Sequence, residues 1–99
     1  KKLFAKNIYW VVAILITNKK INLDAKKVSQ KLNKLGIGTR PFFWPMHRQK
    51  ILKNLKLQNS KLFKNSEYIS KYGFYLPSSL SLKPSEIKYI CEKVNLILK

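Results

Sequence analysis

The sequence predicts a small α+β domain in which a short β-sheet is covered by helices. The chain of 99 residues is long enough for one domain with a modest core. Short β-branched and aromatic runs alternate with stretches in which apolar residues recur every three or four positions. Glycines and prolines separate these stretches. The resulting order of elements is β-α-β-α-α-β-α over a single domain, residues 1–99.

The first predicted element is a strand over the apolar run from Ile8 to Ile16. This run is rich in β-branched and aromatic residues and has polar residues on both sides, which is typical of a strand buried on both faces. Its length is about half of what a membrane-spanning helix needs. We therefore expect a core strand and no membrane segment.

A helix is predicted from Asp24 to Leu35. Asp24 is a suitable N-cap, and Gly36 is a suitable residue to end the helix. The residues between them form one apolar stripe at helical spacing, made up of Ala25, Val28, Leu32 and Leu35. The lysines on the other faces are expected to be solvated.

The middle of the chain should contain a second strand, Ile37 to Phe43, which Pro45 ends. Residues 46–57 have a weak helical pattern, with a possible apolar patch formed by Ile51, Leu52, Leu55 and Leu57. A further helix is predicted to be capped by Asn65 or Ser66.

Glu67 would lie in the first turn of that helix, and Gly73 would end it. Phe74 to Leu76 is the third predicted strand. The last helix is expected to begin near Pro84, a residue favoured at the first helical position, with Glu86 near its third position.

The stripe of the last helix is formed by Ile87, Ile90, Cys91, Val94 and Leu98. Cys91 is expected to be buried and inert because no neighbouring feature would activate its thiol. As the chain has one cysteine and one histidine, an internal disulfide is excluded and a tetrahedral metal site within the chain is not expected.

The net charge of +17 is unusually high, with 21 basic residues against four acidic ones. Such a charge is typical of proteins that bind nucleic acid or anionic membranes. However, only two of the basic residues are arginines, whose planar fork is suited to phosphates and bases. Lys, Asn and Ile share A/T-rich codons, so codon bias also explains this composition. Nucleic-acid binding is therefore the disfavoured alternative.

The stretch from Gly36 to His47 is the candidate binding segment. Two glycines allow sharp turns, and two prolines keep the chain extended and stiff. Arg40 could bind a carboxylate or phosphate, and few acidic residues are present to pair with it. His47 is either a ligand contact or a structural histidine bonded within a loop.

The aromatic run Phe42-Phe43-Trp44 lies inside this segment. Strand alternation would place Phe42 and Trp44 on one face and Phe43 on the other. One face would then belong to the core, and the other could line a pocket or an interface. No nucleophile-base pair, phosphate-binding glycine loop or carboxylate pair is present, so the chain contains no complete catalytic site.

Three segments resemble the C-terminal region of the pyridoxal-phosphate-dependent DegT/DnrJ/EryC1/StrS sugar aminotransferases, most closely the perosamine synthetase-like branch. They are the stretch from Gly36 to His47, the stretch from Gly73 to Leu80 and the last helix at Glu86 to Ile90, and Asn7 to Trp10 resembles the opening strand of that family's small domain. Ser79 stands where the family usually has glycine.

The resemblance implies the small domain of an aspartate-aminotransferase-type fold, as the C-terminal fragment of a longer cytoplasmic enzyme. A large domain upstream would hold pyridoxal 5'-phosphate and supply the Schiff-base lysine, so no catalytic residue is assigned in this chain. The intact enzyme would be a homodimer that moves an amino group, commonly from glutamate, to a nucleotide-linked 4-keto-6-deoxy sugar for polysaccharide biosynthesis. Arg40, Phe42, Trp44 and His47 would contact the substrate. A non-catalytic binding module is the other alternative.

Overall fold

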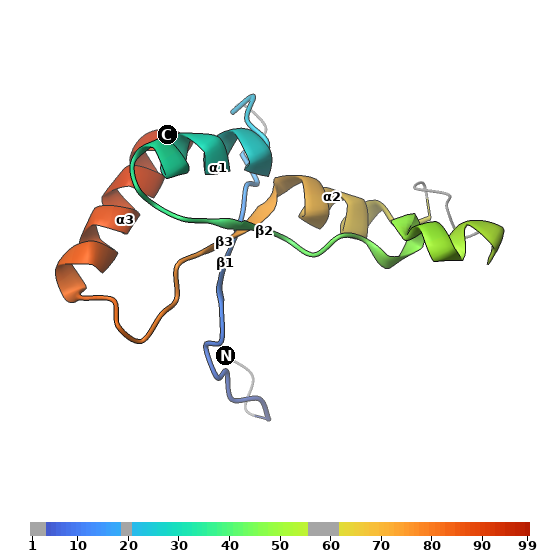
Figure 1. The fold of residues 1–99 in the computed structure, drawn as a ribbon, viewed down its shortest axis with the longest axis horizontal. Helices are drawn as coiled ribbons and strands as arrows, with labels where there is room; N and C mark the ends of the chain where they lie inside the picture. The colour runs from blue at the N-terminus through green and yellow to red at the C-terminus, as the bar shows by residue number, and fades with distance from the viewer. Residues whose placement is uncertain (1–3, 19–20, 56–61) are drawn as a thin grey trace.

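The computed structural model describes residues 4–18, 21–55 and 62–99 (Figure 1). Its sheet contains three strands, β1 (Val12–Leu15), β2 (Arg40–Pro41) and β3 (Gly73–Leu76). They lie in the order β1-β3-β2, and β3 pairs antiparallel with both neighbours. The central strand is therefore the last of the three in the sequence.

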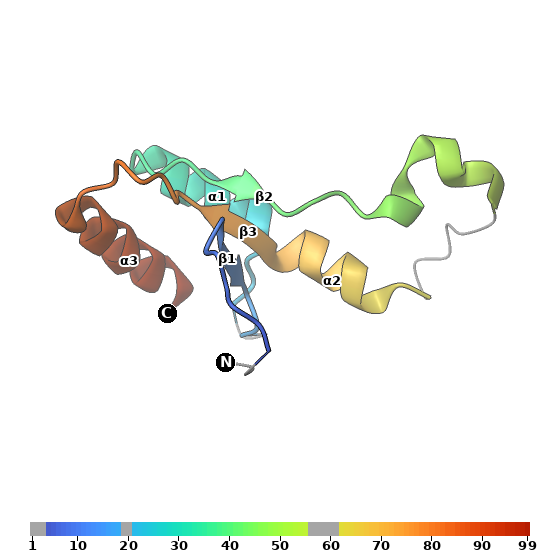
Figure 2. The same cartoon turned by 90° about the horizontal axis from the view of Figure 1, so that it is seen from below.

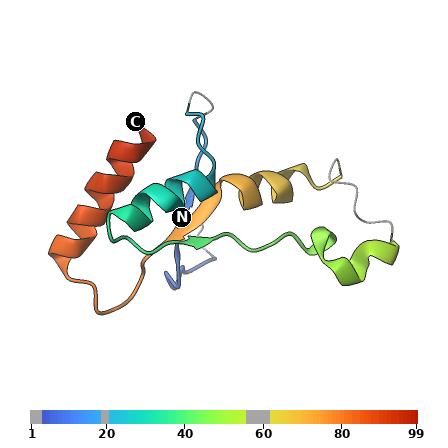
Figure 3. The same ribbon diagram turned by 45° about the horizontal axis from the view of Figure 1, so that its top comes forward.

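Three α-helices accompany the sheet: α1 (Ala25–Lys34), α2 (Lys64–Tyr72) and α3 (Pro84–Leu98). Two 3-10 helices, η1 (Met46–Arg48) and η2 (Lys50–Leu55), follow β2. The predicted α+β class and the order of elements are confirmed, with 3-10 helices in place of the fourth element. Figure 3 shows α1 lying along β2 and β3.

The inner face of the sheet forms the core. Phe74 of β3 is fully buried, and Ile14 lies opposite it on β1. The buried residues that surround Phe74 come mainly from α1 and α3 and are Ile16, Ala25, Val28, Leu32, Ile37, Ile90 and Val94. Most residues of the two predicted stripes therefore supply the core, as amphipathic helices on a sheet do, whereas Leu35 and Ile87 are exposed.

Local capping signals were predicted correctly at two helices. The side chain of Asp24 accepts a hydrogen bond of 2.8 Å from the backbone N–H of Lys27 at the start of α1. Gly36 has φ = 76° just after α1, a conformation that favours glycine. At α3, the carboxylate of Glu86 accepts a 2.7 Å hydrogen bond from the backbone N–H of Lys83.

The first strand differs from the prediction in length and in burial. It covers Val12–Leu15 only, and Tyr9 upstream has φ = 52°, which breaks an extended chain. Val12, Ala13 and Leu15 are exposed, so the expected burial on both faces is wrong. The reason is the topology: β1 is an edge strand, and no described helix covers the outer face that carries Ala13 and Leu15.

Other local predictions also needed correction. The second strand is limited to Arg40–Pro41, and α2 begins at Lys64 without a side-chain cap from Asn65 or Ser66. Cys91 is exposed, because α3 packs through Ile90 and Val94 and turns Cys91 away from the core.

Of the apolar patch expected after Pro45, only Ile51 and Leu52 have described side chains, and Leu52 is half-buried. Ile51 is 86% exposed, and Leu57 lies outside the described residues. We call residues 42–55 the arm, and Figure 2 shows that the arm and α2 both extend away from α1 and α3.

Close packing at Gly73 gives a test of this fold. A Cβ atom at Gly73 would lie 2.5 Å from the carbonyl oxygen of Ile69 and 2.7 Å from the ring of Phe42. Because one of these neighbours is backbone, Gly73→Ala should destabilise the chain by about 1–3 kcal/mol, the usual cost of overpacking. Urea unfolding of the variant would measure this loss.

Gly38→Ala is the matched control. A Cβ atom at Gly38 meets nothing within 4 Å, and this glycine has no positive φ. Its unfolding free energy should stay within about 0.5 kcal/mol of wild type or rise slightly. Equal losses in the two variants would contradict the packing described at Gly73.

Candidate functional site

Arg40 lies on β2, opposite Tyr75 in the antiparallel register. The residue is exposed, and no carboxylate of residues 4–18, 21–55 or 62–99 forms an ion pair with it. That Arg40 binds a ligand or another chain stays a prediction. Its guanidinium group remains available to an anionic ligand.

Phe42 follows directly and lies on the outer face of the sheet. Its ring covers Gly73 and stacks on Tyr75, with 4.7 Å between ring centroids and 24° between ring planes. Phe43 also contacts Tyr75, edge-on at 5.9 Å. The predicted separation of Phe42 and Phe43 onto opposite faces is therefore wrong, because β2 ends at Pro41 and strand alternation ends with it.

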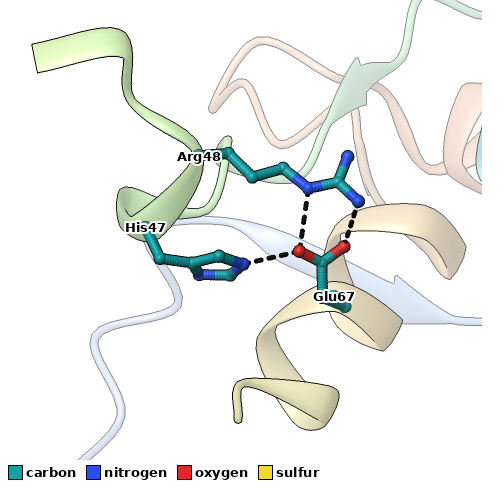
Figure 4. Close-up of polar contacts among 3 residues, drawn as sticks. All are labelled: His47, Arg48 and Glu67. Carbon is teal, nitrogen blue, oxygen red and sulfur yellow. Dashed lines mark hydrogen bonds and ion pairs between the residues drawn. The ribbon is translucent and has the colours of Figure 1, made fainter. Parts of the chain in front are cut away.

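His47 is buried on η1, with 6% of its surface exposed. Its Nε2 lies 2.5 Å from Oε1 of Glu67 on α2, and its ring stacks on Phe63 at 4.6 Å (Figure 4). The structure therefore gives His47 a structural contact, but its partner is the carboxylate of Glu67 on α2 and not a group within a loop, as the sequence interpretation had it. Whether His47 also contacts a ligand stays a prediction.

Arg48 binds the same carboxylate. Its Nε donates to Oε1 of Glu67 at 2.8 Å, and its Nη2 lies 2.5 Å from Oε2 (Figure 4). Such a two-point contact fixes the plane of the guanidinium group. We call His47, Arg48 and Glu67 the clamp, since they join the arm to α2 across about twenty residues of sequence.

The clamp changes the acidity of Glu67. The hydrogen bond from His47, followed by the contacts of Arg48, holds the pKa of Glu67 below its usual value of 4.5. Partial burial acts in the opposite direction but is outweighed. Glu67 is therefore ionised at neutral pH and serves as a fixed negative charge between two basic groups.

Trp44 lies between Phe42 and the clamp. It is 58% exposed, and the guanidinium carbon of Arg48 lies 5.4 Å from the centre of its ring. The four predicted residues therefore form two groups, one at β2 and one beside the clamp. Arg40 and Phe42 belong to the sheet, whereas Trp44 and His47 are held by the clamp.

The sequence interpretation did not include Glu67, Arg48 or Tyr75 among the site residues. One signal was present, because Glu67 is one of only four acidic residues and lies in the first turn of a helix. Its partners could not be identified from the sequence, as they lie 19 and 20 residues away.

A separate cavity of about 560 Å³ lies between the end of β1, the start of α1 and α2. Lys27, Lys71 and the rings of Tyr68 and Tyr72 are among its lining residues. None of the four predicted residues lines it, so it is distinct from the candidate segment.

The described residues do not provide a site for pyridoxal phosphate. Asp24 and Glu86 cap helices and Glu67 belongs to the clamp, which leaves Glu92 alone on the surface of α3. No lysine whose side chain is described is buried. A buried lysine opposite a free carboxylate, as the cofactor's chemistry needs, is therefore not formed within them.

Most of the sequence matches a known protein family. The model of the DegT/DnrJ/EryC1/StrS aminotransferase family matches residues 2–95. The chain therefore belongs to this family of aminotransferases, a family that is generally pyridoxal-phosphate-dependent. A comparison with proteins of curated function found no match. Within the described parts of the chain, no helix has both the length and the apolar character needed to cross a membrane.

The clamp predicts a specific dependence of stability on pH. Because the pKa of Glu67 is lower in the folded state, its contribution is complete above about pH 4.5 and is lost as the pH falls through the lowered value. Glu67→Gln should be less stable than wild type at pH 7 and should lose less stability between pH 7 and pH 3. Unfolding free energies over this range would measure both effects.

Glu92→Gln is the control for the removal of one carboxylate, since Glu92 is exposed on α3. This variant should keep the wild-type stability at pH 7 and the wild-type loss on acidification. If Glu67→Gln followed the same curve as Glu92→Gln, the clamp would contribute nothing to folding.

Proposed function

We propose that this chain is the C-terminal small domain of an aminotransferase that transfers an amino group from glutamate to a nucleotide-linked 4-keto-6-deoxy sugar. The observation that carries the proposal is the family match over residues 2–95. The small antiparallel sheet with helices on one face supports it, because this arrangement agrees with the small domain that the resemblance implies. The reaction would supply amino sugars for polysaccharides, as the resemblance to the perosamine synthetase-like branch implies.

The cofactor would be held by a large domain upstream of this chain. The carboxylates of the described residues are engaged or exposed, and the lysines whose side chains are described are exposed or half-buried, which supports a cofactor site elsewhere in the enzyme. The intact enzyme would be a cytoplasmic homodimer. This fragment alone would be inactive, as it contributes contacts to the substrate and no reacting group.

The outer face of the sheet is the surface that would meet the substrate. It carries Arg40 without an acidic partner among the described residues and the stacked rings of Phe42 and Tyr75. An exposed cation beside an aromatic wall suits an anionic sugar nucleotide, or the carboxylate of the amino donor. His47 would act mainly by holding η1, which Trp44 precedes, since its Nε2 is bound to Glu67.

The test is an assay of the full polypeptide that contains this chain. The purified protein should bind pyridoxal phosphate, with the absorption band of the bound cofactor, and should convert a 4-keto-6-deoxy nucleotide sugar into its 4-amino product with glutamate. Bound cofactor without amino transfer to any such sugar would contradict the proposed substrate class. Absence of cofactor binding would contradict the proposed function altogether.

Arg40 provides the residue-level test. Arg40→Ala should lower kcat/KM for the nucleotide sugar or for glutamate by about 10- to 150-fold, because a hydrogen bond to a charged group contributes about 1.5–3 kcal/mol. Arg40→Lys should recover part of this loss, as it keeps the charge without the planar fork.

Lys88→Ala is the matched control, because Lys88 is an exposed cation on α3 rather than on the outer face of the sheet. Its kinetics should equal those of wild type. Wild-type kinetics in Arg40→Ala as well would remove Arg40 from the substrate site.

A further inference from the structure

We infer that Trp44 is a stacking platform for the base of the nucleotide-linked substrate, and that Glu67 positions this platform through Arg48. The inference rests on the proposed function for the identity of the ligand. It goes beyond that proposal because it assigns the base to one side chain and gives the clamp a role in binding.

Trp44 is highly exposed for a side chain of its size. Indole is among the largest apolar side chains, and yet 58% of this residue is exposed. The guanidinium group of Arg48 lies over the ring at 5.4 Å. An exposed fraction of this size leaves room for a second planar group on the uncovered part of the ring.

Arg48, which lies over the Trp44 ring, is held in place by a network of side chains. Arg48 binds Glu67 through two contacts, and Glu67 also binds the buried His47, which stacks on Phe63. The guanidinium group of Arg48 over the Trp44 ring is therefore held in place by Glu67, which His47 and Phe63 support in turn. A preformed platform loses little conformational entropy when a ligand stacks on it.

The unpaired positive charge near Trp44 belongs to Arg40, as far as the described residues show. Arg40 lies four residues before Trp44 and has no acidic partner among the described residues, while the positive charge of Arg48 is largely offset by Glu67. Four residues of extended chain span about 13 Å, a distance comparable to the length of a nucleoside diphosphate. A base on Trp44 would therefore leave its phosphates on the side of Arg40.

Aromatic stacking suits a base because every base has a planar face, and such contacts are sequence-tolerant. The platform by itself thus favours a nucleotide over a sugar phosphate but does not select one base. Exposed Trp10 has no such cation over its ring in the described residues, which makes it the natural internal control.

The experiment uses the full polypeptide labelled with 5-fluorotryptophan and observed by fluorine NMR. The signals of Trp44 and Trp10 are assigned from the variants Trp44→Phe and Trp10→Phe. The protein is titrated with GDP, UDP and dTDP, and separately with ribose 5-phosphate. We expect at least one nucleoside diphosphate to shift the Trp44 signal, whereas ribose 5-phosphate leaves it in place and Trp10 responds to none of them.

Variants then separate stacking from a general structural effect. Trp44→Ala should weaken binding of that nucleoside diphosphate about 5- to 150-fold, and Trp44→Phe should retain most of the affinity. Glu67→Gln should also weaken binding although the Trp44 ring is unchanged, because no carboxylate then holds the Arg48 guanidinium group over the ring. Since Trp44 is exposed, its replacement should leave the fold intact.

The inference is overturned if no nucleoside diphosphate shifts the Trp44 signal, or if ribose 5-phosphate shifts it equally. It is also overturned if a single-stranded oligonucleotide acts at lower concentration than every nucleoside diphosphate, which would indicate nucleic-acid binding. The aminotransferase assay on the same labelled protein keeps the two proposals apart. Activity with an unresponsive Trp44 refutes the platform alone, whereas a Trp44 response without cofactor binding or amino transfer refutes the proposed function.

Discussion

The central strand β3 is the constraint on which the rest of the structure depends. It is the one strand of the described sheet with partners on both edges, and its Phe74 is fully buried under α1 and α3. Gly73 beside it leaves space for the ring of Phe42 on the opposite face. The same two residues thus fix the core on one face of the sheet and the aromatic wall on the other. This explains why a chain with such a small sheet can still place β2, and with it Arg40, in a defined position.

The scarcity of acidic residues makes each of them informative. In a chain of net charge +17, Asp24 and Glu86 cap helices and Glu67 forms the clamp. Of these three, Glu67 makes the contacts with the longest sequence separation, because it joins the arm to α2. The described arm has few other contacts with the sheet and the α-helices. A carboxylate shared by an arginine and a buried histidine attracts both side chains and also fixes their orientation, since hydrogen bonds to a charged acceptor are short and directional. The position of Glu67 is therefore more informative about function than the high net charge of the chain.

Large aromatic side chains are exposed in two parts of the described structure. Tyr9, Trp10, Phe43 and Trp44 are all more than half exposed, and exposed apolar groups gathered on one molecule commonly mark binding surfaces. The family match makes a substrate and the rest of an aminotransferase the proposed occupants of these surfaces. Under that proposal, the outer face of the sheet and the arm would form one functional region, with the guanidinium group of Arg40 at the sheet and the ring of Trp44 beside the clamp.

The sequence by itself determined the α+β class, the order of the elements, the caps at Asp24 and Glu86 and the stripe of α1, because these depend on contacts within a few residues. It also indicated the segment from Arg40 to His47 as the candidate site. Only the tertiary structure decided that β1 is an exposed edge strand, that Cys91 faces outward and that His47 binds Glu67. Burial depends on which faces of a sheet receive a helix, and the clamp depends on a turn of chain that brings residues 47 and 67 together. Neither is encoded in local spacing, since both arise from contacts between residues that lie far apart in the chain.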